Sequence, residues 1–393
     1  MTEREDVVRA AFAAQARWCA ELGSPFTARL CEIAGERLDR SSAVGRRMLD
    51  WRGNPDALHD SVPLRFAGGL HALVRQGRLP ELARLYPSVI PGLAEGESPD
   101  PLSTDPSERD RTASASPETS AFMGSGLSLR ETQNDSGRLW SAVEAAMRDA
   151  EAELLPWLDL PPQTNEVARS AVLVGGLAAV VARTGLPLAV YELGCSAGLN
   201  LLPDHYDVRL GGRRYGDPTS PVCLRPAWEG GDPPAARVRI VSRRGVDQSP
   251  LFVDRETDRA RLAAYVWADQ TERLARLEAA LAIAVRKPPQ VDRGDAAEWL
   301  DRNLGDHPDR GVTRVVMHSI AFQYFPDTTQ AWITARMAEA GSRASRTEPL
   351  AWLRYEFDPE AGRPSLRLRI WPHGSDTRLA FADAHARSVT WLV

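Results

Sequence analysis

The segment LAVYELGCSAGLNLL, residues 188–202, constrains the fold of this chain more than any other part of the sequence. It starts as an apolar run with the length of a buried strand, passes through Gly194 and Gly198, and ends in an apolar stretch of helical character. A strand, a tight turn and a helix in this order are the opening unit of an α/β fold. We therefore expect a sheet of parallel strands to begin here.

The rest of the C-terminal half alternates between strand and helix patterns. We predict a hairpin across Gly211 and Gly212, a second core strand in 237–247 and one long amphipathic helix over 259–285. Further strands are expected in 289–296, 313–320, 349–357, 366–372 and near 388–393, with helices at 296–304 and 328–340. This alternation predicts an α/β fold whose mainly parallel sheet is covered on both faces and ends in an antiparallel C-terminal edge.

The N-terminal half lacks this alternation and is predicted to be helical. Apolar residues fall at helical spacing over 7–38, and Ser24 followed by Pro25 is typical of the start of a second helix. Residues 91–132 are rich in Ser, Pro, Asp, Glu and Thr, and too poor in apolar residues to offset the entropy of ordering them. We therefore divide the chain into a helical N-terminal region (1–90), a flexible linker or loop (91–132), helices that lead into the core (133–185) and the sheet domain (186–393).

Composition and charge narrow the class of protein. The 393 residues carry a net charge of -5, which gives no general attraction to nucleic acid or to an anionic membrane surface. No apolar run approaches the roughly 20 residues that span a bilayer. The four cysteines are scattered, the first residues are charged, and arginine greatly outnumbers lysine. We expect a cytoplasmic bacterial protein that binds a small molecule, with no metal and no nucleic-acid or membrane partner; a homo- or hetero-oligomer stays open.

The residues of the tight turn indicate the class of ligand. In an open α/β sheet, ligands bind beside the carboxyl ends of the strands where the strand order reverses. A dinucleotide turn has the pattern G-x-G-x-x-G, but Ser196 stands at its second glycine and the pattern fails after Gly198, which disfavours NAD and FAD. The run from Glu192 to Asn200 instead resembles motif I of class I S-adenosylmethionine-dependent methyltransferases, with Ser196 in place of the middle glycine.

This resemblance implies a Rossmann-like, methyltransferase-type sheet that binds S-adenosylmethionine. The implied cofactor-binding residues are Glu192, Gly194, Ser196, Gly198 and Asn200 in the turn, Asp247 for the ribose after the second core strand, and Asp295 for the adenine amino group after the third. Each assignment has a structural alternative. Turn glycines are needed in any fold of this type, the first aspartate suits a turn, and the second suits a helix N-cap before AAEWL.

Over most of its length the chain also resembles a bacterial family known as the domain of unknown function 2332. The matching segments are GSPFTARL, GRLPELARLYPS, QTNEVARS, ELGCSAGLNLL, YVWADQTERLARLEAAL, VVMHSIAFQYF and the terminal VTW. The resemblance implies a methyltransferase-type fold with its own helical N-terminal half and no assigned activity. The chain departs from the family pattern at Ala268, which replaces a proline, at His205, which replaces an arginine, and in the tail, where HARS replaces His-x-His-Gly.

The segment QTNEVARS gathers polar groups within two helical turns. Asn165, Glu166 and Arg169 are three or four residues apart, so a helix would place them within reach of one another. Together with Gln163 they are candidates for binding an amino-acid-like or other polar substrate through charge-assisted hydrogen bonds. The structural alternative is a Thr164 N-cap followed by an ion pair between the glutamate and the arginine.

His318 is the predicted proton acceptor, because it ends a core strand and an imidazole titrates near neutral pH. Glu166 is the second candidate for this catalytic role. Gln323 and Tyr324, in the loop after that strand, are predicted to orient the substrate. The alternative for the histidine is a structural residue whose ring is hydrogen-bonded within the protein.

Two further groups carry less specific patterns. Trp267, Asp269 and Gln270 interrupt the pattern of the predicted long helix, and are candidates either for substrate binding or for capping a neighbouring loop. His373, Asp383 and His385 lie close together in the C-terminal region, but their spacing is not that of a metal site.

The sequence leaves three functions open. The first is an S-adenosylmethionine-dependent, methyltransferase-like enzyme that acts on a small polar molecule, mainly by positioning the reactants. The second is a divergent biosynthetic enzyme that keeps the fold but performs substitution, elimination or cyclisation without that cofactor, alone or with a partner subunit. The third is a non-catalytic ligand-binding or scaffold protein. Convergence of Gln163, Asn165, Glu166, Arg169 and His318 on one pocket would argue against the third.

Overall fold

The computed structural model describes residues 3–54, 60–86, 129–304, 310–372 and 374–393. The chain divides into two compact units, which we call the helical unit (1–161 and 267–271) and the sheet unit (162–266 and 272–393). Most of the predicted linker at 91–132 lies outside the described residues, and its last residues belong to a helix. The boundary after Pro161 lies within the 133–185 stretch that we assigned to helices leading into the core.

The described part of the helical unit is made up of helices. They are α1 (Glu3–Glu21), α2 (Pro25–Arg37), α3 (Ala43–Leu49), α4 (Val62–Arg75), α5 (Pro80–Ala83), α6 (Leu129–Asp149) and α7 (Glu151–Asp159). Helix α1 packs on α2, and α4 packs on α7. The helices bury a shared apolar core that includes Phe12, Met48, Phe66 and Leu154. This arrangement agrees with the helical pattern of the N-terminal sequence.

The start of α2 uses a carboxylate from far along the chain. Ser24 precedes the helix as predicted, but its side chain does not cap it. Asp269 instead accepts the Phe26 amide N–H at 3.0 Å and the Ser24 hydroxyl. Gln270 Nε2 donates to the Leu22 carbonyl oxygen at 3.4 Å. These two polar side chains therefore close the turn between α1 and α2.

The sheet unit is built on a large sheet, nine-stranded in the described residues. Its strands are β1 (Leu188–Leu193), β5 (Ala227–Gly230), β6 (Ile240–Asp247), β7 (Gln290–Arg293), β8 (Thr313–Ser319), β9 (Leu350–Asp358), β10 (Arg363–Trp371), β11 (Thr377–Ala382) and β12 (Ser388–Trp391). They lie in the order β5-β12-β11-β10-β9-β8-β1-β6-β7. The predicted strands are confirmed, whereas β5 and β11 were not predicted.

The parallel part of this sheet has the strand order of a doubly wound fold. β9, β8, β1, β6 and β7 are parallel neighbours. The order of strands reverses beside β1, because the chain first adds β6 and β7 on one side and later β8 and β9 on the other. β10, β11 and β12 continue the sheet in antiparallel fashion, and β5 pairs in parallel with β12 at the edge. The predicted mainly parallel sheet of an α/β protein is confirmed.

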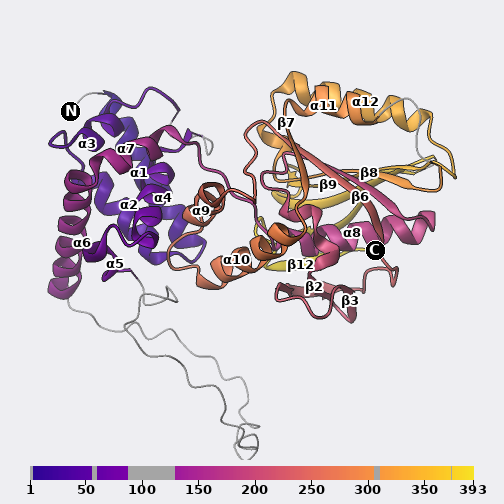
Figure 1. Ribbon diagram of the computed structural model, residues 1–393, viewed down its shortest axis with the longest axis horizontal. Helices are drawn as coiled ribbons and strands as arrows, with labels where there is room; N and C mark the ends of the chain where they lie inside the picture. The colour runs from indigo at the N-terminus through magenta and orange to yellow at the C-terminus, as the bar shows by residue number, and fades with distance from the viewer. Residues whose placement is uncertain (1–2, 55–59, 87–128, 305–309, 373) are drawn as a thin grey trace, which may run out of the picture. The chain divides into compact units, whose positions relative to one another are not determined.

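Helices cover both faces of this sheet. Helix α8 (Arg169–Thr184) lies on one face, and α11 (Ala296–Leu304) and α12 (Asp327–Ser342) lie on the other (Figure 1). Side chains alternate between the two faces along a strand. Val315 and Met317 accordingly pack with α8, whereas Val316 between them packs with α11 and α12. We call these the α8 face and the α12 face.

The prediction of a helix directly after β1 is wrong. The chain forms two short 3₁₀ helices there (Leu199–Leu201 and Pro203–His205), followed by a hairpin of β2 (Asp207–Leu210) and β3 (Arg213–Gly216). With β4 (Cys223–Leu224) the hairpin forms a three-stranded sheet. Pro203 accounts for the difference, because the residue before a proline is disfavoured in the helical region. The hairpin across Gly211 and Gly212 is confirmed.

The prediction of a single long helix over 259–285 is also wrong. The chain forms α9 (Glu256–Ala264) and α10 (Thr271–Arg286), separated by the segment that caps α2. The polar groups of this segment bond to the turn of the helical unit, and this interrupts the helix. None of the described helices is long and apolar enough to cross a membrane.

Candidate functional site

The turn after β1 is closed by hydrogen bonds from within the chain. The Ser196 amide N–H donates to Asp247 Oδ2 at 2.9 Å, and the Leu199 amide donates to Asn165 Oδ1 at 2.9 Å. The Gly194 amide donates to the carbonyl oxygen of Val246, at the end of β6, at 2.9 Å. Backbone donors that such a turn could offer to a ligand are therefore already used at these three positions.

The two glycines of the turn leave room for the chain itself. An ideal Cβ on Gly194 would lie 2.7 Å from Ala321 Cβ in the loop after β8. One on Gly198 would lie 2.8 Å from Val291 Cγ2 on β7. Both glycines also have positive φ values, of 69° and 74°. The turn thus requires glycine for packing and backbone conformation even in the absence of a ligand.

Glu192, on β1, carries an unpaired carboxyl group. The residue is buried, and its Oε2 makes no hydrogen bond within the described part of the chain. Burial, with the charge of Asp247 second, raises the pKa of this carboxyl well above its usual range. Ser196 Oγ is likewise buried without a partner among the described residues. Unpaired buried polar atoms are rare in native proteins, so both atoms are candidates for contact with a ligand or a water molecule.

The two aspartates assigned to the ribose and the adenine already accept backbone hydrogen bonds. Asp247 Oδ1 accepts the Ser249 amide at 2.9 Å, in addition to the bond from Ser196 on Oδ2. Asp295 Oδ1 accepts two amide N–H groups of the first turn of α11, at 2.9 and 3.1 Å, and so acts as a helix N-cap. A carboxylate has about four acceptor positions, so each aspartate can accept further bonds.

His318 lies on the α12 face with both ring nitrogens hydrogen-bonded. Nδ1 is 2.7 Å from Glu356 Oε1, and Trp352 Nε1–H donates to Nε2 at 3.1 Å. Because an indole N–H can only donate, we assign the acceptor role to Nε2 and the proton to Nδ1. The side chain is 1% exposed and stacks on Phe322 with ring centroids 4.6 Å apart. Neither ring nitrogen is left for a substrate in this arrangement.

Glu356 joins this histidine to the loop after β8. Its Oε1 also accepts the amide N–H groups of Ala321 and Phe322, each at 3.1 Å. Ile320, just before them, has a φ of 48°, which is unusual for a β-branched residue. One partly buried carboxylate thus holds the loop that covers Gly194.

Glu166 lies before α8, which begins only at Arg169, so the considered helix start at Thr164 is not found. Its carboxylate forms a buried ion pair. Its Oε2 is 2.5 Å from Arg273 Nε, its Oε1 is 3.8 Å from Arg276 Nη2, and Oε1 also accepts the Ala168 amide at 3.1 Å. Burial acts to raise the pKa of Glu166, but Arg273, His385 and Arg276 outweigh it and hold the pKa below its usual range. This side chain is a stable carboxylate and a weak proton acceptor.

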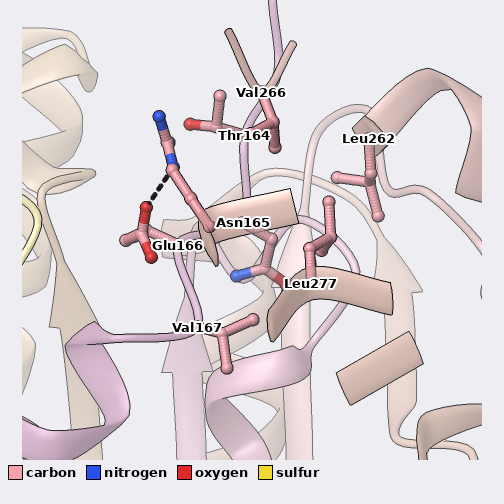
Figure 2. A pocket seen from close by; sticks show the side chains of 8 residues that line it. Thr164, Asn165, Glu166, Val167, Leu262, Val266 and Leu277 are labelled. Atoms are coloured by element: carbon pink, nitrogen blue, oxygen red, sulfur yellow. Dashed lines mark ion pairs between the residues drawn. The ribbon is translucent and has the colours of Figure 1, made fainter. Parts of the chain in front are cut away.

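Glu166 and Arg273 form the charged wall of a small pocket, which has room for about one water molecule. Figure 2 shows the ion pair on one side of the pocket and apolar side chains on the other. The remaining lining residues are Thr164, Asn165, Val167, Leu262, Val266 and Leu277. The pocket thus combines one ion pair with apolar side chains, and a ligand larger than water would need the surrounding side chains to move.

A tight loop places His385 near this ion pair. Arg169 Nε donates to the Ala384 carbonyl oxygen at 3.0 Å, and the Tyr355 hydroxyl donates to the carbonyl oxygen of Asp383. Asp383 Oδ1 accepts the His385 amide at 2.9 Å. The loop is therefore fixed, yet both ring nitrogens of the histidine are buried and make no hydrogen bond within the described residues.

The surroundings of His385 keep its ring neutral. Burial lowers its pKa most, Arg273 and Arg169 add to the effect, and Glu166 and Asp383 oppose it, with a resulting pKa of about 4. At neutral pH the ring therefore offers one N–H donor and one acceptor nitrogen.

The structure separates candidates that the sequence grouped together. Glu192 has the same parity along β1 as Val190, which packs with α8. His318 has the same parity along β8 as Val316, which packs with α11 and α12. Glu192 and His318 accordingly lie on opposite faces of the sheet. Of the five residues expected to converge, Asn165 and Glu166 line the pocket, and His318 belongs to a different network.

The other sequence candidates have diverse surroundings. Gln163 Oε1 is buried and has no hydrogen-bond partner among the described residues, and Asn200 is buried and accepts the Ser170 hydroxyl at 2.7 Å. Gln323 and Tyr324 are exposed in the loop after β8. The remaining three belong to the helical unit: Trp267, Asp269 and Gln270.

Sequence reasoning missed Arg273, Arg276 and the surroundings of His385. The two arginines are three residues apart in a predicted amphipathic helix, so their shared side of the helix was an available signal. The histidine had no local signal, because its place depends on the pairing of β11 with β12 and on contacts with Arg169 and Tyr355.

Metal binding finds no support in the part of the chain that the structure describes. There, no group of three or more His, Cys, Asp or Glu side chains is placed to hold an ion. His373, which the sequence grouped with Asp383 and His385, lies outside the described residues.

A protein-family model described as an uncharacterized protein conserved in bacteria (DUF2332) matches residues 9–102 and 127–391 of the chain. The chain belongs to this family. The resemblance noted from the sequence segments is thereby confirmed, and DUF2332 extends over parts of both units. No curated protein and no solved structure matches the chain.

Proposed function

We propose that this DUF2332 protein is an enzyme that uses S-adenosylmethionine to methylate a small polar molecule at the carboxyl edge of its sheet. The observation that carries the proposal is the unpaired, buried carboxyl group of Glu192. It lies on β1, beside which the strand order reverses, and ligands of doubly wound sheets bind at this point.

The residues around the turn are compatible with such a cofactor. Glu192 and Ser196 each have an unpaired buried oxygen that could bond to the amino-acid end of the cofactor. Asp247 and Asp295 keep acceptor positions for hydroxyl and amino groups of the adenosine end. Bound S-adenosylmethionine would supply an electrophilic methyl group, and the chain would bind and orient both reactants. Because Ala321 lies against the turn, we expect the loop after β8 to shift when the cofactor binds.

The proposal is tested by isothermal titration of the full chain with S-adenosylmethionine, S-adenosylhomocysteine and NAD. We expect both sulfur ligands to bind and NAD not to bind. Glu192→Gln should lower the affinity for the sulfur ligands by about tenfold, which is the effect of losing one charge-assisted hydrogen bond. The matched control is Glu229→Gln, which changes an exposed carboxylate on β5 and should leave binding unchanged.

Two outcomes would overturn the proposal. One is that neither sulfur ligand binds the folded protein, and the other is that Glu192→Gln and the control bind them equally well. A substitution at Gly194 is unsuitable for this test, because its side chain would meet Ala321 even in the free protein.

A second candidate is a biosynthetic enzyme on the same sheet that performs substitution, elimination or cyclisation without S-adenosylmethionine. The packing of the turn favours it, since Gly194 and Gly198 face side chains of the protein and Asp247 binds the Ser196 amide. Its substrate would bind beside Glu166, where the small pocket would have to widen to admit it. The same titration separates the two candidates, because the second predicts no binding of either sulfur ligand.

A further inference from the structure

We propose that His385 and Arg276, beside the Glu166–Arg273 ion pair, recognise an oxyanion of a small molecule, either a carboxylate or a phosphate. The proposal rests on the proposed function only in calling this molecule the substrate. Binding at this place can be tested without any cofactor.

The first argument is the set of polar atoms that lack partners. Both ring nitrogens of His385 are buried without a hydrogen bond in the described structure, and so is Arg276 Nε. The nearest carboxylate oxygen to Arg276, from Glu166, is 3.8 Å from Nη2 and thus beyond hydrogen-bond distance. A buried polar atom without a partner is destabilising, so a bound partner would be favoured.

The second argument is charge. Arg273 and Arg276 act on Glu166, and Arg169 interacts with Glu166 and Glu356, so three arginines face two carboxylates and the positive groups are in excess. The nearby carboxylate of Asp383 is occupied, because it accepts backbone amides of its own loop and pairs with Arg387. A ligand that neutralises this excess is an anion, and guanidinium groups favour planar or multidentate oxyanions.

The third argument is rigid placement. Arg169 bonds to the carbonyl oxygens of Ala384 and Ser319, and Tyr355 bonds to that of Asp383, so the loop is tied to the sheet at several points. Ala386 is held at a φ of 54°, an uncommon conformation for alanine. A histidine with only a structural role would use its ring nitrogens in these contacts. This one is held by its backbone, which leaves the imidazole available to a ligand.

The chemistry of the site follows from the neutral ring of His385. One nitrogen would donate its N–H to the oxyanion beside the N–H of Arg276 Nε. The other nitrogen would accept a hydrogen bond from a hydroxyl or amino group of the same molecule. A small acid with such a group adjacent to its charged end fits both requirements.

The experiment is an NMR titration of the full chain with ¹⁵N-labelled histidine, at a pH at which the protein is folded. The chain has seven histidines, and His385→Gln identifies the signals of interest. Sodium acetate and sodium phosphate are added separately, with sodium chloride at equal ionic strength as the reference. We expect at least one of the two oxyanions to shift the His385 signals in a saturable way, and chloride not to do so. A response to acetate assigns a carboxylate, and a response to phosphate assigns a phosphate.

Arg276→Gln tests the second recognition residue. The substitution should lower the affinity for the oxyanion by about tenfold, as expected for the loss of one charge-assisted hydrogen bond. The matched control is Arg225→Gln, because Arg225 also lies 3.8 Å from a carboxylate, that of Asp207, but on the small sheet. This control should leave the titration unchanged. If Arg276→Gln does not fold, Arg276→Lys keeps the charge and removes the Nε donor, and it should also weaken binding.

Three results would overturn the proposal. They are the absence of any shift at His385 beyond that caused by chloride, a shift that never saturates, and equal affinity in the Arg276 variant and the Arg225 control. Each would mean that the unpaired nitrogens serve no ligand and that buried water satisfies them. Because no S-adenosylmethionine is present, a failure of the cofactor proposal leaves this result unaffected.

Discussion

Two histidines with buried ring nitrogens, one on each side of the sheet, differ in how those nitrogens are hydrogen-bonded. On the α12 face, both ring nitrogens of His318 are bonded, to Glu356 and to Trp352. On the α8 side, both ring nitrogens of His385 are unpaired, although its loop is tied down by Arg169. A closed set of hydrogen bonds is sufficient to explain the first histidine as part of the structure. The second is held in place by groups that do not use its ring, which is the arrangement expected of a ligand-binding residue.

The carboxyl groups of Glu356 and Glu192 differ in the same way, since one is hydrogen-bonded within the protein and the other has an unpaired oxygen. Glu356 accepts the His318 ring and the amide groups of Ala321 and Phe322. Glu192, on the other face, has no hydrogen bond on Oε2 in the described structure and has a raised pKa because of burial. Loss of the Glu356 carboxylate should therefore lower the free energy of unfolding, whereas loss of the Glu192 charge should raise it.

The largest effect is expected for Glu356→Ala. The substitution leaves the His318 Nδ1–H and two backbone amides without an acceptor, so the free energy of unfolding should fall by about 3–5 kcal/mol. Urea unfolding followed by circular dichroism measures this change. Glu360→Ala, at a side chain that is 87% exposed, is the control and should change it by less than about 0.5 kcal/mol. Similar losses in both variants would remove the distinction between the two faces.

The next largest effect is expected in the pH dependence of stability, through His385. Its pKa is lowered from 6.5 to about 4, so the contribution of the neutral ring is fully present above pH 6.5 and is lost as the pH falls through 4. Relative to His385→Gln, the unmodified protein should lose on the order of 3 kcal/mol of unfolding free energy by pH 4. Urea unfolding at a series of pH values measures both proteins. Parallel pH curves would show that the imidazole is not buried in its neutral form.

A smaller effect of opposite sign is expected for Glu192→Gln. Because the pKa of Glu192 is raised in the folded state, its contribution to stability is lost as the pH rises through that pKa. The glutamine does not ionise, so the variant should be the more stable protein above that pKa, by on the order of 1 kcal/mol. The gain should shrink toward pH 4. Thermal unfolding of the two proteins across this range tests the sign, and a loss at high pH would imply a carboxylate partner.

The smallest effect is expected for Ser196→Gly. Ser196 has a φ of 54° and a buried hydroxyl without a partner in the described structure. Glycine adopts this conformation without steric cost, so we expect a gain of about 0.5 kcal/mol in unfolding free energy. Denaturant unfolding with replicate samples can resolve this change. A clear loss would show that the hydroxyl is bonded in solution.

Much of the sheet could be predicted from local sequence, because its strands are short apolar runs bounded by turn residues. β1, β6, β8 and β9 all lie where their patterns indicate. Two predicted helices failed for reasons that lie outside their apolar periodicity. Pro203 prevents a helix after β1, and the bonds from Asp269 to the start of α2 interrupt the segment between α9 and α10.

The candidate site was predictable only in part. The segment around Glu166 stood out as a cluster of polar groups at helical spacing, and two of its residues line a pocket. Its main partner, Arg273, lies more than a hundred residues away on α10, and no local pattern joins the two. His318 was singled out by its place at a strand end, but that place says nothing about the partners of its ring.

The sequence by itself determined the strands, the glycine turn after β1 and membership in DUF2332, because these depend on residue types close together along the chain. Only the tertiary structure decided which polar side chains are paired. That outcome depends on strand parity, which sends Glu192 and His318 to opposite faces, and on the pairing of β11 with β12, which leads the chain to His385. Hydrogen bonding between distant residues is a property of the assembled fold, and it separates structural side chains from those that can meet a ligand.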